Sequence, residues 1–222
     1  MPFLTHLLHG ESAPPSFDNL PNVIEQNIIV ANYGASQGVD NDDGSSFYSI
    51  RDNIFYGADG FKMDYGGHSS SFYSNLVMVI PYDGSNCINV GGFKEGIGDA
   101  FYNNTCISGI SGLDMPSGCG SLTCSNASHK VPDMNTLGQV SSCNASFTLL
   151  HSNRYYSPHN NGSLKCSGKL TTIAEVQKEY QNEVGSSAEG LPTYQAALGW
   201  AAAFVKSWGA PPAVSASTIA RR

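Results

Sequence analysis

The sequence has few charged residues, no long apolar run and no cysteine motif typical of zinc. Lys, Arg, Asp and Glu make up only 13% of the 222 residues, and the formal net charge is −7 at pH 7. Nucleic-acid binding requires clustered Lys and Arg, so we expect no nucleic-acid partner. No apolar run reaches the roughly 18 residues of a membrane-spanning helix, and we therefore expect no transmembrane segment.

The cysteines contain no CxxC pair, which argues against a zinc ribbon. Their even number favours three disulfides, as in proteins of oxidising compartments. Cys119 and Cys124 enclose a small loop, and Cys143 is a candidate partner of Cys166, although spacing alone leaves the pairing open. The six residues are Cys87, Cys106, Cys119, Cys124, Cys143 and Cys166.

Four N-x-[ST] sequons accompany the cysteines and favour a secreted eukaryotic glycoprotein. The apolar run in the N-terminal MPFLTHLLHGESAPP is too short for a signal peptide, so we expect the chain to be a segment of a longer precursor. The expected glycosylation sites are Asn103, Asn126, Asn144 and Asn161.

What the sequence does contain is a repeat. An Asn followed by a short β-prone run recurs at Asn27, Asn53, Asn75 and Asn104, with spacings of 26, 22 and 29 residues. Units of this length without a helical period predict an all-β parallel β-helix, a solenoid whose successive coils pair through parallel strands. We expect each Asn at a bend, where its amide bonds the equivalent Asn of the next coil.

Two further phrases recur in each unit. The Phe residues of the first phrase, Phe47, Phe72 and Phe101, are predicted to stack inside the solenoid. The second phrase is predicted to form a short strand whose alternate residues point inward. The first phrase is Ser46–Tyr48, Ser71–Tyr73 and Ala100–Tyr102; the second is Gly38–Asp40, Phe61–Asp64 and Ile88–Val90.

The C-terminal part predicts a closing coil and two helices that cap the solenoid or pack on it. Asn153-Arg-Tyr-Tyr reads as the final coil, and Thr172-Ile-Ala-Glu175 is a capping box that opens a short helix. A second, amphipathic helix is expected to begin near Pro192. The predicted organisation is a solenoid over 1–190 with disulfide-stapled loops over about 108–166, a helix within 191–209 and a flexible tail over 210–222.

The run Gly38-Val-Asp-Asn-Asp-Asp-Gly-Ser-Ser45, followed by Gly60-Phe-Lys-Met-Asp64, resembles secreted right-handed parallel β-helix proteins of the pectate-lyase-like superfold. In many of these polysaccharide lyases and glycoside hydrolases, a G-[IV]-D-x-D-D-G-S-[SN]-Y phrase precedes a strand and a G-x-K phrase opens the next coil. The resemblance covers roughly residues 20–190. It implies a right-handed β-helix whose partner is a polysaccharide or other glycan.

Strand alternation places a set of polar side chains on one outer surface. If Phe61 and Met63 point inward, Lys62 and Asp64 point outward, and neighbouring strands lie about 4.8 Å apart. Paired carboxylates suit glycoside hydrolysis, and a lysine between them suits contact with a uronate or proton abstraction in β-elimination. We therefore assign catalysis to Asp40 and Asp64, and substrate contact to Lys62, His68 and Asn89.

Other interpretations of the same residues remain open. Asp42 and Asp43 are strong turn formers, and with Asp40 they form a weak candidate calcium site; no other cofactor is expected. The second functional hypothesis is a non-catalytic extracellular module that binds glycans, adheres or builds a matrix, with end-to-end stacking of chains as a further possibility.

Overall fold

The computed structural model describes most of the central and C-terminal chain. Its described residues are 20–30, 37–64, 66–79, 86–91, 98–108, 136–158 and 162–209. The predictions for Cys119, Cys124, Asn126, Asn161 and the 210–222 tail lie outside these residues.

The described strands form three sheets. Sheet A contains β1 (Asn22–Glu25), β4 (Tyr48–Arg51), β7 (Ser71–Tyr73), β10 (Asp99–Tyr102) and β13 (Thr148–His151). Sheet B contains β2 (Ile28–Val30), β5 (Ile54–Tyr56), β8 (Leu76–Val79), β11 (Thr105–Ser108), β14 (Arg154–Ser157) and β17 (Ser187–Gly190). Sheet C contains β3 (Val39–Asn41), β6 (Phe61–Met63), β9 (Ile88–Val90), β12 (Thr136–Val140), β15 (Ser163–Cys166) and β16 (Lys169–Thr172).

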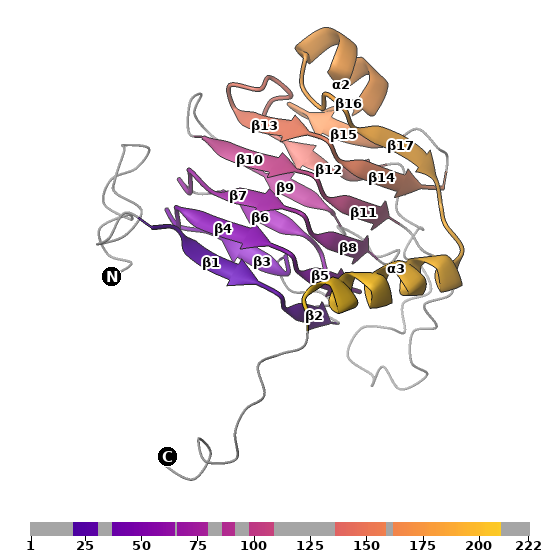
Figure 1. Ribbon diagram of the computed structural model, residues 1–222. Coiled ribbons are helices and arrows are strands. Elements are labelled where there is room, and N and C mark those ends of the chain that lie inside the picture. The colour runs from indigo at the N-terminus through magenta and orange to yellow at the C-terminus, as the bar shows by residue number, and fades with distance from the viewer. Residues whose placement is uncertain are drawn as a thin grey trace, which may run out of the picture.

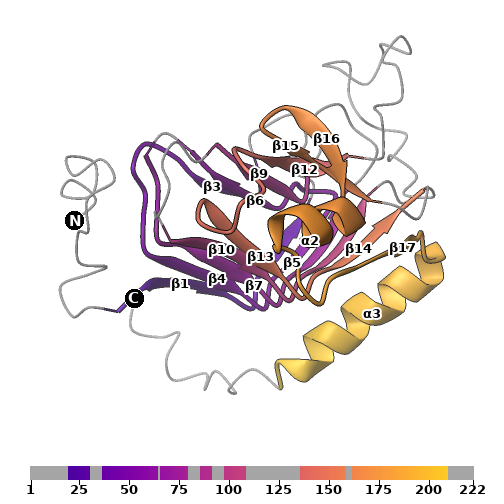
Figure 2. The same ribbon diagram turned by 90° about the horizontal axis from the view of Figure 1, so that it is seen from above.

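From β1 to β15 the chain visits sheets A, B and C in turn, and over this range neighbouring strands of each sheet pair in parallel (Figure 1). Viewed along the stack, the strands of each sheet superimpose and the three sheets surround a common interior (Figure 2). The pair β15–β16 is antiparallel. The prediction of an all-β architecture with parallel strand pairing is confirmed.

The bend between sheets A and B is built from two residues with different tasks. The first has a left-handed backbone with φ between 53° and 56°, and the second is the repeated Asn. From Asn27 to Asn104, the N–H and Nδ2–H of each Asn donate to Oδ1 of the Asn in the next repeat at 2.9–3.2 Å, which confirms the predicted amide ladder. The bend pairs are Gln26-Asn27, Asp52-Asn53, Ser74-Asn75, Asn103-Asn104 and Ser152-Asn153.

The interior holds an aromatic stack that differs from the predicted one. Phe72 and Phe101 are buried and stack with ring centroids 5.3 Å apart. The neighbour of Phe72 in β4 is Ile50, not Phe47. Phe47 precedes β4, has φ 62° and packs its ring against His68. The predicted alignment was wrong here because the first phrase in this unit lies three residues before the strand residues that pair with β7.

Two disulfides link residues of the described strands and turns. Cys87 is bonded to Cys106 in β11, and Cys143 is bonded to Cys166 in β15, so the candidate pairing of the latter two is confirmed. All four residues are buried. Part of the region expected to be disulfide-stapled loops, Thr136–Val140, is instead the strand β12.

The end of the stack after β13 is covered by α2 (Ile173–Tyr180), which begins with the predicted capping box between Thr172 and Glu175 (Figure 1). Ile173 and Val176 of this helix are part of the core. Asn153 does not open the final strand of sheet B, because β17 pairs with β14 beyond it.

The second helix, α3 (Tyr194–Ser207), lies outside the space enclosed by the three sheets, along sheet B (Figure 2). Its apolar side packs on outward-facing residues of β5, β8, β11 and β14, and the hydroxyls of Tyr194 and Tyr56 are 2.8 Å apart. None of the helices described by the structure is long and apolar enough to cross a membrane.

Candidate functional site

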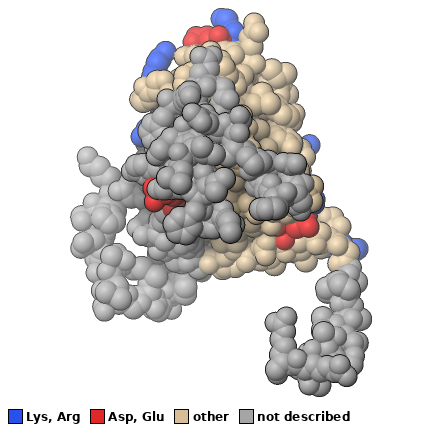
Figure 3. Space-filling view, turned by 90° about the vertical axis from the view of Figure 1, so that its left-hand side faces the viewer, with Lys and Arg blue, Asp and Glu red and all other residues tan. Residues whose placement is uncertain are grey.

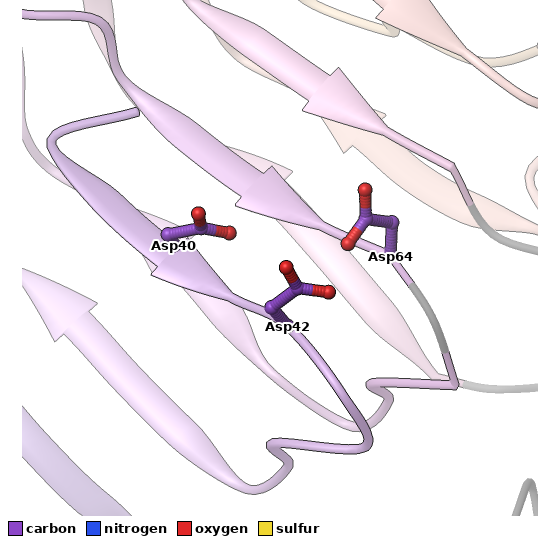
Figure 4. Close-up of side chains that lie close together, drawn as sticks. All are labelled: Asp40, Asp42 and Asp64. Carbon is purple, nitrogen blue, oxygen red and sulfur yellow. The ribbon is translucent and has the colours of Figure 1, made fainter. Parts of the chain in front are cut away.

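A cluster of acidic side chains lies on the outer surface of sheet C, where β3 and β6 run side by side (Figure 4). Asp40 lies opposite Lys62 in this parallel pair, and Asp42 and Asp64 directly follow the two strands. Phe61 and Met63 are fully buried on the opposite side of β6. Strand alternation therefore places Asp40, Lys62 and Asp64 outward, as the sequence predicts.

The ammonium group of Lys62 lies among the three carboxylates. Its Nζ is 3.0 Å from Asp40 Oδ1, 3.3 Å from Asp42 Oδ2 and 3.4 Å from Asp64 Oδ2. The Lys62 side chain is only 12% exposed, whereas the Asp42 side chain is 39% exposed. One carboxylate oxygen from each of the three aspartates lies within 4.8 Å of the others.

The environment moves the pKa values of two neighbouring carboxyls in opposite directions. Burial and hydrogen bonding with Asp42 raise the pKa of Asp64 to about 6, although Lys62 opposes the shift. Burial acts to raise the pKa of Asp42, but hydrogen bonds with Asp64, the Asp43 N–H and Lys62 outweigh it and lower that pKa. A pair with separated pKa values can supply one protonated and one ionised carboxyl at the same pH.

Lys62 is suited to charge compensation and not to proton abstraction. Burial alone would lower the pKa of its ammonium, but hydrogen bonds to Asp40 and Asp42 and the charges of Asp40 and Asp64 raise it above its ordinary value. An amine with a raised pKa remains protonated at neutral pH and cannot act as a general base there. The interpretation of Lys62 as a base in β-elimination is therefore not supported.

The other predicted substrate-contact residues, Asn89 and His68, are not among the ion-pair partners of Lys62. Asn89 follows Lys62 across sheet C and its Oδ1 accepts a hydrogen bond from Gln139 Nε2 at 2.8 Å. His68 is only 4% exposed, and burial lowers its pKa. Its Nδ1 is 3.0 Å from Ser69 Oγ, and none of the ion pairs described for Lys62 includes it.

Of the two weak candidates for calcium ligands, Asp42 and Asp43, only Asp42 lies in the cluster. Asp42 belongs to the cluster, whereas Asp43 occupies the turn after β3 with φ 49°, and its N–H donates to Asp42 Oδ1. The cluster supplies carboxylate oxygens, the ligand type that calcium prefers, but calcium takes 6–8 oxygen ligands. The Lys62 ammonium contacts all three carboxylates, so a cation would have to displace it.

From the sequence, Asp42 is expected to be a turn residue or a calcium ligand, and its hydrogen bond with Asp64 was not predicted. The sequence signal for the outward direction of Asp42 was its spacing from Asp40, because residues two apart on an extended chain point the same way.

A second polar residue not predicted from the sequence is Asp99, at the start of β10. It is 2% exposed, and burial raises its pKa to about 7 although its carboxylate accepts a hydrogen bond from the Ser70 N–H. Its Oδ2 has no hydrogen-bond partner among the described residues. The available signal was its spacing from Phe101, because residues two apart on a strand point the same way and Phe101 is predicted to point inward.

Charged side chains are sparse beyond the cluster. On the face shown in Figure 3, the described surface is mostly uncharged, with a few scattered acidic and basic groups.

Comparison of the chain with protein-family models, curated proteins and solved structures gives no match.

Proposed function

We propose that this protein is an extracellular right-handed parallel β-helix that hydrolyses glycosidic bonds in a neutral polysaccharide. The observation that carries the proposal is the pair Asp42 and Asp64, whose pKa values are moved apart on the outer surface of sheet C. Support for the fold comes from the parallel pairing and the A–B–C order of the strands. Its hand and its membership of the pectate-lyase-like superfold rest on the sequence resemblance.

Two features support an extracellular location. The buried disulfides Cys87–Cys106 and Cys143–Cys166 are of a kind that persists in oxidising compartments. The sequon residues Asn103 and Asn144 are both exposed, so an attached glycan would not disturb the core.

In the proposed reaction, Asp64 is the general acid. With a pKa of about 6 it holds a proton in mildly acidic solution and donates it to the glycosidic oxygen as the bond to the anomeric carbon breaks. Asp42, which stays ionised, attacks the anomeric carbon to form a glycosyl ester. Asp64 then takes a proton from water, which hydrolyses the ester and restores both carboxyls. The carboxyl oxygens of Asp42 and Asp64 lie within 4.8 Å of each other and the two groups are hydrogen-bonded, so they are closer than the ~5–5.5 Å of retaining enzymes and a substrate has to part them.

The proposed pair differs from the Asp40 and Asp64 pair expected from the sequence, because Asp42 takes the catalytic role of Asp40, and Asp40 and Lys62 position Asp42 and Asp64. The ammonium holds Asp42 and Asp64 together, and Asp40 fixes the ammonium from the neighbouring strand. The cluster contains three carboxylates and one ammonium, so it stays negative when all are ionised. A uronate would be repelled, and we therefore assign a neutral glycan as the substrate.

The second candidate is a non-catalytic extracellular module. The observation that favours it is that Lys62 contacts all three aspartates, because such a network can hold β3 and β6 together without any reaction. The two proposals differ in whether Asp64 is needed for bond cleavage.

The test compares cleavage of neutral and acidic polysaccharides by the wild type and by Asp42→Asn, Asp64→Asn and Asp43→Asn variants. We expect release of reducing ends from a neutral glycan, lowered roughly 10²–10⁴-fold in the first two variants because an acid or nucleophile is lost. Asp43 lies in the adjacent turn, so its variant is the matched control and should remain active.

NMR of the initial product should show the anomeric configuration retained. Melting temperatures of all variants separate lost chemistry from lost folding. Binding without cleavage by the wild type on every glycan would refute the hydrolase and support the non-catalytic module.

A further inference from the structure

The amide ladder at the A–B bends has a direction. Each Asn donates its N–H and Nδ2–H to Oδ1 of the Asn one repeat later, as Asn27 does to Asn53. The residue after the later Asn donates its N–H back to the carbonyl oxygen of the earlier one, as Ile54 does to Asn27. The same return bond recurs at Leu76, Thr105, Arg154 and Ser187.

The ladder is closed at its C-terminal end. Asn153 Nδ2 donates to Glu183 Oε2 at 3.1 Å, and its N–H donates to Ser186 Oγ at 2.8 Å. The Glu183 carboxylate also accepts a hydrogen bond from the buried Tyr155 hydroxyl. Gln177 of α2 donates to the carbonyl oxygens of Glu183 and Ser186, so the helix holds this closure in place.

At the opposite end the ladder is open. Asn27 Oδ1 is the equivalent of the acceptors used in every later repeat, and among the described residues it receives no hydrogen bond. Because the Asn27 carbonyl faces Ile54, the next residue, Ile28, directs its N–H to the other edge of β2. This open edge is formed by β1 and β2, the terminal strands of sheets A and B.

Apolar side chains accompany these polar groups. Val23 in β1 and Ile28 and Val30 in β2 are 50%, 54% and 56% exposed. In the next repeat, the equivalents of Ile28 and Val30 are Ile54 and Tyr56, which pack in the cluster beneath α3. Among the described residues, the open edge therefore presents both an unfinished hydrogen-bond pattern and exposed apolar side chains.

A second copy of the chain does not match this pattern. Its closed end is covered by α2 and Glu183, and its open end would bring Asn27 Oδ1 against Asn27 Oδ1, two acceptors. The matching group is an Asn whose N–H and Nδ2–H reach Asn27 Oδ1 and whose carbonyl accepts from Ile28 N–H.

We propose that the open edge binds, by parallel strand addition, an extended polypeptide segment that carries Asn at a bend between two apolar strands. Strand addition of this kind obtains affinity from main-chain hydrogen bonds and specificity from side-chain positions. This interaction is independent of the proposed glycan hydrolysis.

The probe is a labelled peptide with the chain's own bend sequence, Tyr48–Tyr56, flanked by lysines for solubility. We expect saturable binding to the full-length protein by fluorescence anisotropy, weakened about tenfold when Ala replaces the Asn in the peptide. Ile28→Pro removes the donor N–H and should abolish binding, whereas Ile28→Ala keeps the N–H and should retain most of it. Hydrogen exchange at the Ile28 amide should slow when the peptide binds.

Three results would overturn the proposal. These are absence of saturable binding by the wild type, equal binding of the Asn and Ala peptides, or a wild-type dimer in sedimentation that Ile28→Pro dissociates. The last would show that a second copy covers the edge. Circular dichroism establishes whether Ile28→Pro folds; if it does not, the peptide pair and the Ile28 exchange rate decide.

Discussion

Replacing Asp99 with Asn should stabilise the protein, and by an amount that depends on pH. Asp99 is 2% exposed, and its pKa is raised from 3.8 to about 7 by burial. The folded state therefore binds a proton that the unfolded state has released between these pH values. Stability from this group is fully present below pH 3.8, falls as pH rises through this window, and is lost above about 7.

The size of the effect follows from the shift. About three pKa units at 1.36 kcal/mol each correspond to roughly 4 kcal/mol of stability lost between acid and neutral pH. Asn keeps the oxygen that accepts from the Ser70 N–H but carries no charge to desolvate. The Asp99→Asn variant should match the wild type near pH 4 and exceed it by a few kcal/mol at pH 8.

Urea unfolding of both proteins from pH 4 to pH 8 measures this difference. Glu183 is also buried and its pKa is raised, but it is present in both proteins and cancels in the comparison. Asp52→Asn, which removes a carboxylate from the surface beside Arg51, controls for the loss of one negative charge. A stability difference that is the same at pH 4 and pH 8, or a variant less stable than the wild type throughout, would refute the reasoning.

Three further outcomes follow from the same structure. Lys62→Met should free the three carboxylates for a divalent cation, so millimolar calcium should raise the melting temperature of this variant and leave that of the wild type unchanged; an equal response of both would contradict this. Asn75→Ala should lower the free energy of unfolding by about 3 kcal/mol or more, because it leaves several buried polar groups unpaired at ~1–3 kcal/mol each, whereas Asn22→Ala, at an exposed position in the extended strand β1, should cost little. Replacing Cys143 and Cys166 with serine should cost about 2–5 kcal/mol, measured by urea unfolding under oxidising conditions, and a variant as stable as the wild type would show that this bridge is dispensable.

The sequence alone determined the repeat and the residues that face outward. Asn27, Asn53, Asn75 and Asn104 recur before β-prone runs, and an amide at a repeated bend has its equivalent in the next coil as its nearest partner. The alternation of Phe61, Lys62 and Met63 fixes inward and outward positions because the side-chain period of a strand is two. These are local patterns, and the structure agrees with both.

Register, pairing and proton affinity were decided by the tertiary structure. Phe47 and Phe72 occur in similar phrases, yet Ile50 takes the position beside Phe72, because register depends on how the preceding turn folds. The coupling of Asp42 to Asp64 and the raised pKa of Asp99 depend on burial and on neighbours from other coils. Desolvation and through-space charge depend on three-dimensional distance, which residue order within one repeat does not specify.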